Sequence, residues 1–441
     1  MTAIPTAARV RGLTTAQWLL ALLGLNAMWV TDLLVMDGGL DDNLLTVFGR
    51  ATGLYGALLL VFQLFLIARV PWLERGLGMD QMTRWHRWTG FWVLWLLLAH
   101  VVFITLGYAA ADGSPLLDEF GTLVFDTDDV LKATAAMVLL VVVAVTSARA
   151  ARRMMRYETW HFVHLYAYLA VILGFLHQVT VGRDFVGSPL ATAYWWTLYG
   201  ASLAAILLAR VLIPLWRNAR HQLRVHSVVP ESPTVVSVYI TGRRLPELPA
   251  RAGQFFLWRF LTRDRWWEAH PYSLSAMPDG RSLRITVKAL GDGSAWLRTI
   301  RPGTRVFAEG PYGSFTSAKR GSRGALLIGG GVGITPIRAL MEELRGDIVA
   351  VYRANQWEDT VLATELRQLA QRARAQLHMV VGPVDDRLLS AGHLAALVPD
   401  IRQRDVFVCG PPGMTEAVLA TLRALDVPAD QCHAERFAFA S

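Results

Sequence analysis

Long apolar runs dominate the first half of the chain and determine its predicted organisation. Six stretches contain no Asp, Glu, Lys or Arg and approach the length of about 20 residues that a helix needs to cross a bilayer. They cover residues 12–31, 51–68, 88–110, 133–148, 159–182 and 185–209. One such run is compatible with a buried core helix, but six in succession favour a membrane bundle. We therefore predict six transmembrane helices within residues 1–216, embedded in a lipid bilayer.

Beyond residue 216 the apolar runs are shorter, and the pattern changes twice. Short β-branched runs separated by Pro and Gly turns predict a small antiparallel β-barrel within residues 217–320. These runs are 234–241, 254–261, 282–290 and 305–309. Within residues 321–441, apolar strands alternate with helices, which predicts an α/β domain whose parallel sheet is covered on both faces. The strands are expected near 325–328, 348–352, 377–381 and 406–409, and the helices near 335–344, 360–372 and 414–425.

Charge indicates the orientation of the predicted bundle. The net charge is +8, carried mainly by arginines that lie between the apolar runs. Because arginines favour the cytoplasmic side, their positions predict that both termini are cytoplasmic in an integral protein of the plasma or inner membrane. The same clustering argues against a nucleic-acid partner. The arginines in question are Arg69, Arg75, Arg84, Arg87, Arg149, Arg152, Arg153, Arg156, Arg217, Arg220 and Arg224.

The cysteine content excludes several kinds of metal site. Cys409 and Cys432 are the only two cysteines, too few for an iron–sulfur cluster or a four-thiolate zinc site. The chain has no Cys-x-x-Cys-His sequence, so a haem would not be attached covalently in that way.

Five of the eleven histidines fall in or beside two of the apolar runs, the third and the fifth, where ionisable groups are costly and mark function. His86 and His100 are fourteen residues apart. On one helix their side chains would point in directions about 40° apart and would be separated by about 21 Å along the axis. Two haems stacked across a membrane require ligands at about that spacing. His164 and His177 in the fifth run complete two predicted bis-histidine sites, His86 with His164 and His100 with His177, a ligation that suits electron transfer.

The spacing within the fifth run fits less well than that within the third. His164 and His177 are thirteen residues apart, so on an ideal helix their side chains would point in directions about 140° apart. A tilt, or a distortion near Gly174, is therefore needed if both side chains are to face the third helix. His161 is the alternative to His164, although its spacing from His177 is no better. Arg50, at the end of the second run, is either a snorkelling side chain or a partner for a haem propionate or an anionic product.

Two short motifs in the predicted barrel carry possible cofactor chemistry. His270, Pro271, Tyr272, Ser273 and Ser275 lie at a strand end, where an aromatic ring could pack on an isoalloxazine and hydroxyl groups could bind its edge. Gly291, Gly293 and Ser294 follow the next strand, which ends near Lys288, and are expected to open a helix whose free N–H groups suit a diphosphate. We take these residues as candidate FAD-binding residues, although glycine turns of this kind are common.

A third motif follows the first strand of the predicted α/β domain. It comprises Gly329, Gly330, Gly331, Gly333, Thr335 and Pro336, where the backbone can approach a dinucleotide diphosphate. A tight strand-to-helix turn is the other explanation, since the sequence is not a strict Gly-x-Gly-x-x-Gly. Arg353 ends the second strand, where an arginine favours the 2′-phosphate of NADPH over NADH, or is a solvated loop charge. Cys409, Gly410 and Pro411 form a later turn, and Phe437 lies near the end of the sequence.

In order and spacing, these motifs resemble the ferredoxin–NADP reductase superfamily, and with the helical half the chain resembles the transmembrane ferric reductase and NADPH oxidase superfamily. The resemblance implies that Tyr272 and Ser273 contact the isoalloxazine and that His270 stands where soluble relatives often have an arginine. It also implies that Gly291–Ser294 holds the FAD diphosphate and Gly329–Pro336 the nicotinamide dinucleotide. Cys409 would lie near the nicotinamide, and Phe437 would cover the flavin until the nicotinamide displaces it.

The predicted protein is thus an NAD(P)H oxidase or ferric reductase-type enzyme, a flavocytochrome with FAD and two b-type haems. Cytoplasmic NADPH, or NADH, would supply electrons to a small acceptor across the membrane. Dioxygen giving superoxide and a ferric chelate remain two alternatives for that acceptor, and no obligatory protein partner is expected. A third hypothesis, from another class, is a non-enzymatic membrane anchor or transporter with a flavin-like domain.

Overall fold

The computed structural model describes residues 14–36, 43–155, 157–186, 188–322, 324–383, 385 and 387–436. Internal contacts divide the chain into two compact units, Met1–Arg210 and Val211–Ser441. We call them the membrane unit and the C-terminal unit, and describe each by itself. The predicted domain boundaries at residues 216 and 320 remain predictions.

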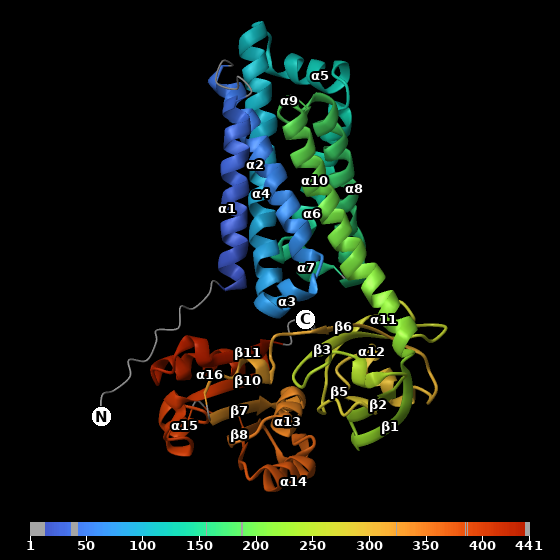
Figure 1. The fold of residues 1–441 in the computed structure, drawn as a ribbon, viewed down its shortest axis with the longest axis vertical. Coiled ribbons are helices and arrows are strands. Elements are labelled where there is room, and N and C mark those ends of the chain that lie inside the picture. The colour runs from blue at the N-terminus through green and yellow to red at the C-terminus, as the bar shows by residue number, and fades with distance from the viewer. Residues whose placement is uncertain are drawn as a thin grey trace, which may run out of the picture. The chain divides into compact units, whose positions relative to one another are not determined.

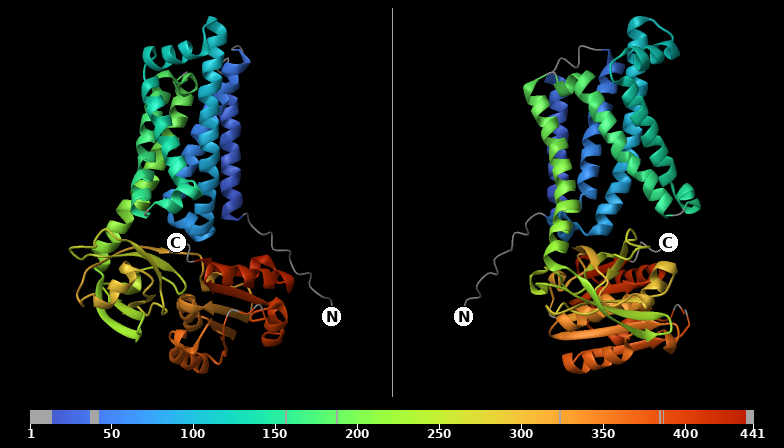
Figure 2. Two further views of the ribbon diagram at one scale, coloured as in Figure 1. Left: turned by 180° about the vertical axis from the view of Figure 1, so that it is seen from behind. Right: turned by 90° about the vertical axis from the view of Figure 1, so that its right-hand side faces the viewer.

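The membrane unit consists of helices (Figure 1). They are α1 Thr15–Met36, α2 Leu44–Ile67, α3 Pro71–Leu77, α4 Met79–Asp112, α5 Leu116–Asp126, α6 Val130–Ser147, α7 Arg149–Met154, α8 Tyr157–Val181, α9 Arg183–Val186 and α10 Pro189–Ile206. The π-helix Leu207–Leu212 and α11 Ile213–His221 follow α10. Among the described residues, six helices are long and apolar enough to cross a membrane, which agrees with the six predicted runs. Figure 2 shows the long helices of this unit running roughly side by side.

Small residues allow α2 and α4 to pack closely. A Cβ added to Gly49 would lie 2.7 Å from the Ile104 side chain, and one added to Gly56 would lie 2.8 Å from Leu97. Close approach through small residues is how membrane helices gain van der Waals contact, because lipid provides no hydrophobic drive between them. Large apolar side chains such as Trp92 and Trp95 remain exposed on α4, as expected for a surface that faces lipid.

Helix α5 lies between the third and fourth predicted runs, where no helix was predicted. Asp118 and Glu119 lie in its first turn, where carboxylates favour the positive end of the helix dipole. Ser114 Oγ also donates to Glu119 at 2.6 Å. These two acidic residues therefore help to start the helix.

The first part of the C-terminal unit, residues 224–312, contains two antiparallel sheets; we call it the antiparallel half. Its strands are β1 Arg224–Ser232, β2 Val235–Thr241, β3 Phe255–Phe260, β4 His270–Ser273, β5 Leu283–Lys288 and β6 Val306–Tyr312. The sheet orders are β1-β2-β5 and β4-β3-β6, and isolated bridges join Arg224 to Arg305 and Leu274 to Ile285. Both sheets contribute to one core that includes Val238, Trp258 and Ile285. The predicted closed barrel is not confirmed, because the two sheets are open.

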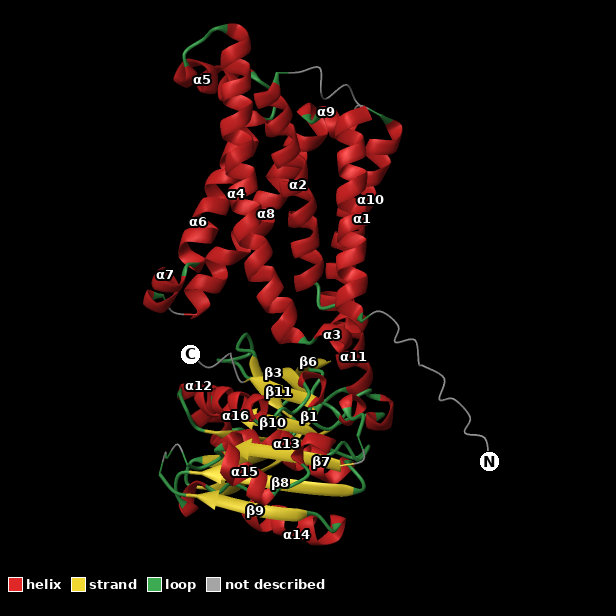
Figure 3. Ribbon diagram, turned by 90° about the vertical axis from the view of Figure 1, so that its left-hand side faces the viewer, coloured by secondary structure: helices red, strands yellow, loops and turns green. Residues whose placement is uncertain are grey.

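The second part, residues 324–436, is the parallel half. Its strands are β7 Gly324–Gly330, β8 Asp347–Ala354, β9 Gln376–Val381, β10 Arg404–Gly410 and β11 Cys432–Arg436, in the order β11-β10-β7-β8-β9, all parallel (Figure 3). Its main helices are α13 Ile334–Glu343, α14 Ala363–Ala373, α15 Ala391–Leu397 and α16 Pro412–Ala424. Alternate strand residues face opposite sides: Leu327 packs with α13 and α14, and Leu326 packs with α15 and α16. The predicted parallel sheet with two covered faces is confirmed.

Candidate functional site

Two histidines on different helices face each other in the membrane unit. The ring centroids of His86 on α4 and His164 on α8 lie 6.1 Å apart, and the ring planes are inclined at 68°. With metal–nitrogen bonds of about 2.0–2.1 Å, two imidazoles on opposite sides of one ion place their ring centres about 6 Å apart. His86 Nδ1 is buried and has no hydrogen-bond partner among the described residues. The pair therefore has the separation of two axial ligands.

Ser147, at the end of α6, orients the His164 ring. Its Oγ lies 3.2 Å from His164 Nδ1. The same oxygen accepts a hydrogen bond from Trp160 Nε1 at 3.2 Å. Because Nδ1 is directed at Ser147, Nε2 is the His164 nitrogen left for a metal. A polar partner on the distal ring nitrogen is the usual arrangement at metal-ligating histidines.

The backbone of α2 orients His100 in a similar way. His100 Nδ1 lies 2.8 Å from the carbonyl oxygen of Gly49, which accepts the hydrogen bond. A carbonyl can only accept, so the proton is on Nδ1 and Nε2 carries the free lone pair. Gly53 leaves the space for this ring, because a Cβ there would lie 2.6 Å from His100 Nδ1.

His177 lies on α8 with a buried Nδ1 that has no partner among the described residues. The distortion that we considered near Gly174 is absent, since Tyr157–Val181 is one continuous α-helix. His161, the alternative ligand, is exposed one turn before His164.

His86 and His164 form a pair that is not part of a larger cluster of metal-binding side chains among the described residues. Among the described residues, no group of three or more His, Cys, Asp or Glu side chains could hold a metal ion by itself. Haem iron needs only two axial ligands from the protein. Paired imidazoles with orphaned or oriented Nδ1 atoms therefore fit a haem better than a bare ion.

Arg50 lies on α2 and is buried, with 9% of its surface exposed, so it does not reach solvent as a snorkelling side chain would. Its Nε donates to Asp184 Oδ2 at 3.0 Å, and its Nη2 donates to Oδ1. Asp184, on α9, is also buried. The ion pair joins α2 to the segment before α10. A role for Arg50 toward a haem propionate or an anionic product stays a prediction.

The predicted isoalloxazine residues lie on β4. The His270 ring stacks on Tyr272 with a centroid distance of 5.8 Å, and His270 Nε2 lies 3.3 Å from Glu268 Oε2. The Tyr272 carbonyl accepts a hydrogen bond from Trp258 Nε1 at 2.9 Å. Burial, assisted by Glu268, raises the pKa of the Tyr272 phenol well above its ordinary value, so this hydroxyl stays protonated. Pro271 and Ser273 complete the strand, which pairs with β3.

Ser275 is placed differently from the other residues of this motif. Its side chain is fully buried, and its Oγ accepts hydrogen bonds from Arg284 Nε at 3.0 Å and Thr286 Oγ1 at 2.8 Å. Arg284 Nη2 also donates to the Ser275 carbonyl at 2.7 Å. The Ser275 hydroxyl is thus engaged within the protein, and it connects the β4 segment to Arg284.

A network of charges joins the two halves of the C-terminal unit. Glu365 on α14 accepts hydrogen bonds from Arg284 on β5 at 3.0 Å and from Arg338 on α13. Arg338 also pairs with Glu342, whose carboxylate accepts from the Met277 backbone N–H at 2.8 Å. Sequence reasoning missed these residues. The available signal was an arginine with apolar neighbours on both sides in each of two segments, β5 and α13.

The second glycine turn is closed by its own serine. Ser294 Oγ accepts hydrogen bonds from the N–H groups of Leu290 and Gly291 at 2.8 and 3.0 Å. Gly293 packs against His270, since a Cβ there would lie 2.8 Å from the ring. Lys288, just before the turn, lies 3.3 Å from Asp359 of the parallel half. The turn thus lies beside the β4 motif.

The glycines between β7 and α13 have two kinds of role. Gly331 has φ of +53°, and an added Cβ would meet no atom within 4 Å, so this residue leaves open space. Gly333 lies close to β10, where a Cβ would come within 2.4 Å of the Cys409 carbonyl oxygen. A Cβ added to Gly329 would lie 2.6 Å from Ile334, and one added to Gly330 would lie 2.3 Å from Met414. Most of this motif is therefore explained by close packing, and Gly331 is the position that a ligand could approach.

The other predicted nucleotide residues surround this turn. Thr335 is buried and donates from Oγ1 to the Val332 carbonyl at 2.9 Å, and Pro336 is buried beside it. Cys409 ends β10, and burial raises the pKa of its thiol well above the ordinary value. Gly410 and Pro411 follow it before α16. Arg353 ends β8 and donates to the carbonyls of Ala354 and, at 2.8 Å, Pro383. Phe437 lies outside the described residues.

Comparisons with known proteins identify the class. Residues 52–175 match the family described as "Ferric reductase like transmembrane component", and residues 327–420 match "Oxidoreductase NAD-binding domain". The chain therefore belongs to the ferric reductase and NADPH oxidase-like superfamily, with a C-terminal module of the ferredoxin–NADP reductase type. Both matches are to components of oxidoreductases, so one chain combines a ferric reductase-like transmembrane component with an oxidoreductase NAD-binding domain.

Curated relatives match mainly the C-terminal unit. The ferredoxin reductase component of 3-ketosteroid-9-alpha-monooxygenase from Mycobacterium tuberculosis is 31% identical over 233 residues, 49% of this chain and 65% of that protein. A flavohemoprotein from Pseudomonas putida is 30% identical over 286 residues, 59% of this chain and 71% of that protein. The chain spans about 65% of the length of the first curated relatives it matches.

Solved structures also match about half of the chain. The FAD/NAD binding domain of nitric oxide dioxygenase from Vibrio cholerae has a TM-score of 0.42 at 25% identity, covering 49% of this chain and 98% of that one. A ferredoxin reductase in carbazole 1,9a-dioxygenase has a TM-score of 0.41 at 23% identity, covering 49% and 69%.

Proposed function

We propose that this protein carries electrons from NAD(P)H through FAD and two b-type haems to an acceptor on the far side of the membrane. The observation that carries the proposal is the pair His86 and His164, whose ring centroids are 6.1 Å apart on two different membrane helices. In this proposal they are the axial ligands of one haem. His100 and His177 are the ligands of the other, with His100 Nδ1 bonded to Gly49 and its Nε2 free.

The C-terminal unit would supply these electrons. We infer that the antiparallel half, within residues 217–320, holds FAD and that the parallel half, within 321–441, holds the nicotinamide nucleotide. When bound, FAD supplies the conversion of a two-electron donor into single-electron steps. Tyr272 and Ser273 would contact the isoalloxazine from β4. Glu365, Arg284 and Ser275 would hold that strand in a fixed position relative to the parallel half.

The histidine assignment has a direct test in the visible spectrum and haem content of the purified full chain. We expect two haems per chain in the wild type and one in His86→Ala, His164→Ala, His100→Ala and His177→Ala. His161→Ala should retain both haems, as should the matched control His226→Ala, which changes an exposed histidine of the C-terminal unit. A wild type without a Soret band would reject the proposal in favour of a non-enzymatic anchor or transporter.

We propose dioxygen as the acceptor and superoxide as its one-electron product. His86, His164, His100 and His177 would hold the two haems, which when bound would supply one-electron transfer. A ferric chelate is the second candidate, with which the acidic segment that includes Asp112, Asp118 and Asp126 is compatible. NADPH-driven cytochrome c reduction that superoxide dismutase abolishes would support dioxygen. A rate that superoxide dismutase leaves unchanged, together with ferric-chelate reduction in the absence of oxygen, would support the ferric chelate.

We further propose that NADPH is preferred to NADH and that both termini are cytoplasmic. Arg353 at the end of β8 is the candidate for the 2′-phosphate, and Arg353→Ser should lower the ratio of kcat/KM for NADPH over NADH. An unchanged ratio would remove Arg353 from this role. The orientation has an independent test, since a protease added to sealed right-side-out vesicles should leave the C-terminal unit intact.

A further inference from the structure

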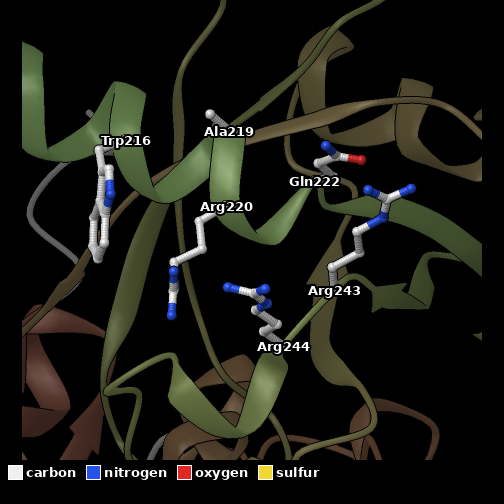
Figure 4. Close-up of a pocket in the computed structure, with 6 residues that line it drawn as sticks. All are labelled: Trp216, Ala219, Arg220, Gln222, Arg243 and Arg244. Carbon is white, nitrogen blue, oxygen red and sulfur yellow. The ribbon is translucent and has the colours of Figure 1, made fainter.

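A basic pocket lies in the C-terminal unit, between the end of α11 and the loop after β2 (Figure 4). Its volume is about 420 Å³, and we call it the arginine pocket. The residues that line it are Trp216, Ala219, Arg220, Gln222, Arg243 and Arg244. Figure 4 shows the Arg244 guanidinium on the side of Arg220 and Trp216, and the Arg243 guanidinium on the side of Gln222.

The charges around the arginine pocket are not balanced within the protein. Arg220 is neutralised by Glu247, which accepts from its Nε at 2.9 Å, and its guanidinium lies 5.4 Å from the centre of the Trp216 ring. Arg243 and Arg244 are exposed, and their side chains have no hydrogen bond or ion pair within the described part of the chain. Two guanidinium groups thus remain for an anion, and their planar forks suit the oxygens of a phosphate.

The arginine pocket is separate from the predicted flavin site. In the ladder of β2 and β5, Val235 pairs with Lys288 and Ile240 pairs with Leu283. The glycine turn Gly291–Ser294 follows Lys288, at one end of this ladder, whereas Arg243 follows Thr241 beyond the other end. Six residues of strand correspond to about 20 Å. A flavin diphosphate on the glycine turn would therefore not fill the arginine pocket.

The surroundings of the arginine pocket indicate the source of the anion. Leu215 and Trp216 on α11 are 53% and 59% exposed, and they follow the sixth apolar run directly in sequence. Tryptophan is enriched at membrane–water interfaces. Clusters of arginine next to a transmembrane helix bind anionic lipids. A lipid headgroup also accounts for the exposed apolar residues beside these arginines, whereas binding of a free phosphate would not need them. We propose that the arginine pocket binds the phosphate of an anionic phospholipid headgroup through Arg243 and Arg244, with Trp216 at the bilayer boundary.

The test measures lipid binding by the purified full chain with native mass spectrometry, using dioleoyl phosphatidylglycerol, dioleoyl phosphatidylcholine and inorganic phosphate as probes. The variant R243Q/R244Q removes the two unpaired charges. The matched control R367Q/R372Q removes the same charge from the exposed face of α14. We expect phosphatidylglycerol to bind at least about tenfold more weakly to R243Q/R244Q than to the wild type or the control.

Other outcomes would overturn the proposal. Equal binding of phosphatidylglycerol and phosphatidylcholine, or equal loss in both double variants, would show that the arginine pocket is not the site. Displacement of phosphatidylglycerol by millimolar inorganic phosphate would assign the site to a free phosphate. If R243Q/R244Q does not fold, R243K/R244K and Trp216→Ala replace it. The lysine variant should keep most of the binding and Trp216→Ala should weaken it severalfold, and the opposite order would reject the assigned roles.

Discussion

Arg284 on β5 and Glu365 on α14 form an ion pair, with 3.0 Å between Nη1 and Oε2, that joins the antiparallel and parallel halves of the C-terminal unit. The Arg284 side chain is 6% exposed and that of Glu365 is 30% exposed. Arg284 also binds Ser275 through the hydroxyl and the carbonyl. The Glu365 carboxylate of the parallel half is therefore linked through Arg284 to Ser275, which belongs to the motif predicted to bind the flavin.

Glu365→Gln should destabilise the C-terminal unit, because Arg284 and Arg338 would lose the carboxylate they share. We expect a loss of about 1–3 kcal/mol, less than for a fully buried pair because Glu365 is partly solvated. Thermal unfolding of the full chain, followed by near-ultraviolet circular dichroism, measures the change. The matched control is Glu358→Gln, an exposed glutamate nearby, which should be neutral. Equal melting temperatures for the two variants would contradict the linking role.

Ser147→Ala should weaken retention of the haem assigned to His86 and His164. The change removes the hydroxyl that lies 3.2 Å from His164 Nδ1, and loss of such a partner typically costs about 10- to 100-fold in metal affinity. Haem loss to apomyoglobin and the redox potential of each haem are the measurements.

Two further variants isolate the Ser147 hydroxyl. Ser147→Thr should restore the wild-type values, and Thr146→Ala, which removes a hydroxyl bonded only to helix carbonyls, should leave them unchanged. A shift in both haem potentials, or in neither, would show that Ser147 does not act through His164.

Gly53→Ala should disturb the other haem. The added Cβ would lie 2.6 Å from His100 Nδ1, so the ring must leave its hydrogen bond to Gly49. We expect haem content to fall toward one per chain, measured as the pyridine haemochrome. Gly174→Ala is the control, since an added Cβ there meets nothing within 4 Å. Full haem content in Gly53→Ala would mean that His100 is not held by this packing.

Asp405 should make stability depend on pH in the acid range. Burial opposes ionisation of its carboxyl, but hydrogen bonds from Ser322, Gly321 and His433 outweigh it and hold the pKa below the ordinary value. The folded state then binds the proton less readily than the unfolded state. The stabilising contribution is therefore present above the ordinary pKa of about 3.9 and is lost as the pH falls through the lower folded value.

Asp405→Asn measures this contribution. We expect the variant to be less stable by about 2 kcal/mol between pH 5 and 7, with the difference from wild type shrinking below about pH 4. Asp264→Asn, at an exposed aspartate, is the control and should show no such pH dependence. A difference between wild type and Asp405→Asn that stays constant down to pH 3 would contradict the lowered pKa.

The sequence by itself determined the architecture, because apolar runs as long as a bilayer is thick, and strand–helix alternation, are local patterns with few structural solutions. It also related His86 and His100 to each other as candidate ligands, since helical periodicity places them near one face of a single helix.

Only the tertiary structure decided which side chains meet. His164 faces His86 although the spacing on α8 is unfavourable, and Ser147, Asp184 and Glu365 reach partners that no local pattern indicates. The two sheets of the antiparallel half likewise stay open where the strand pattern predicted a closed barrel. These features depend on packing between elements distant in sequence, which is a property of the whole fold and not of any one segment.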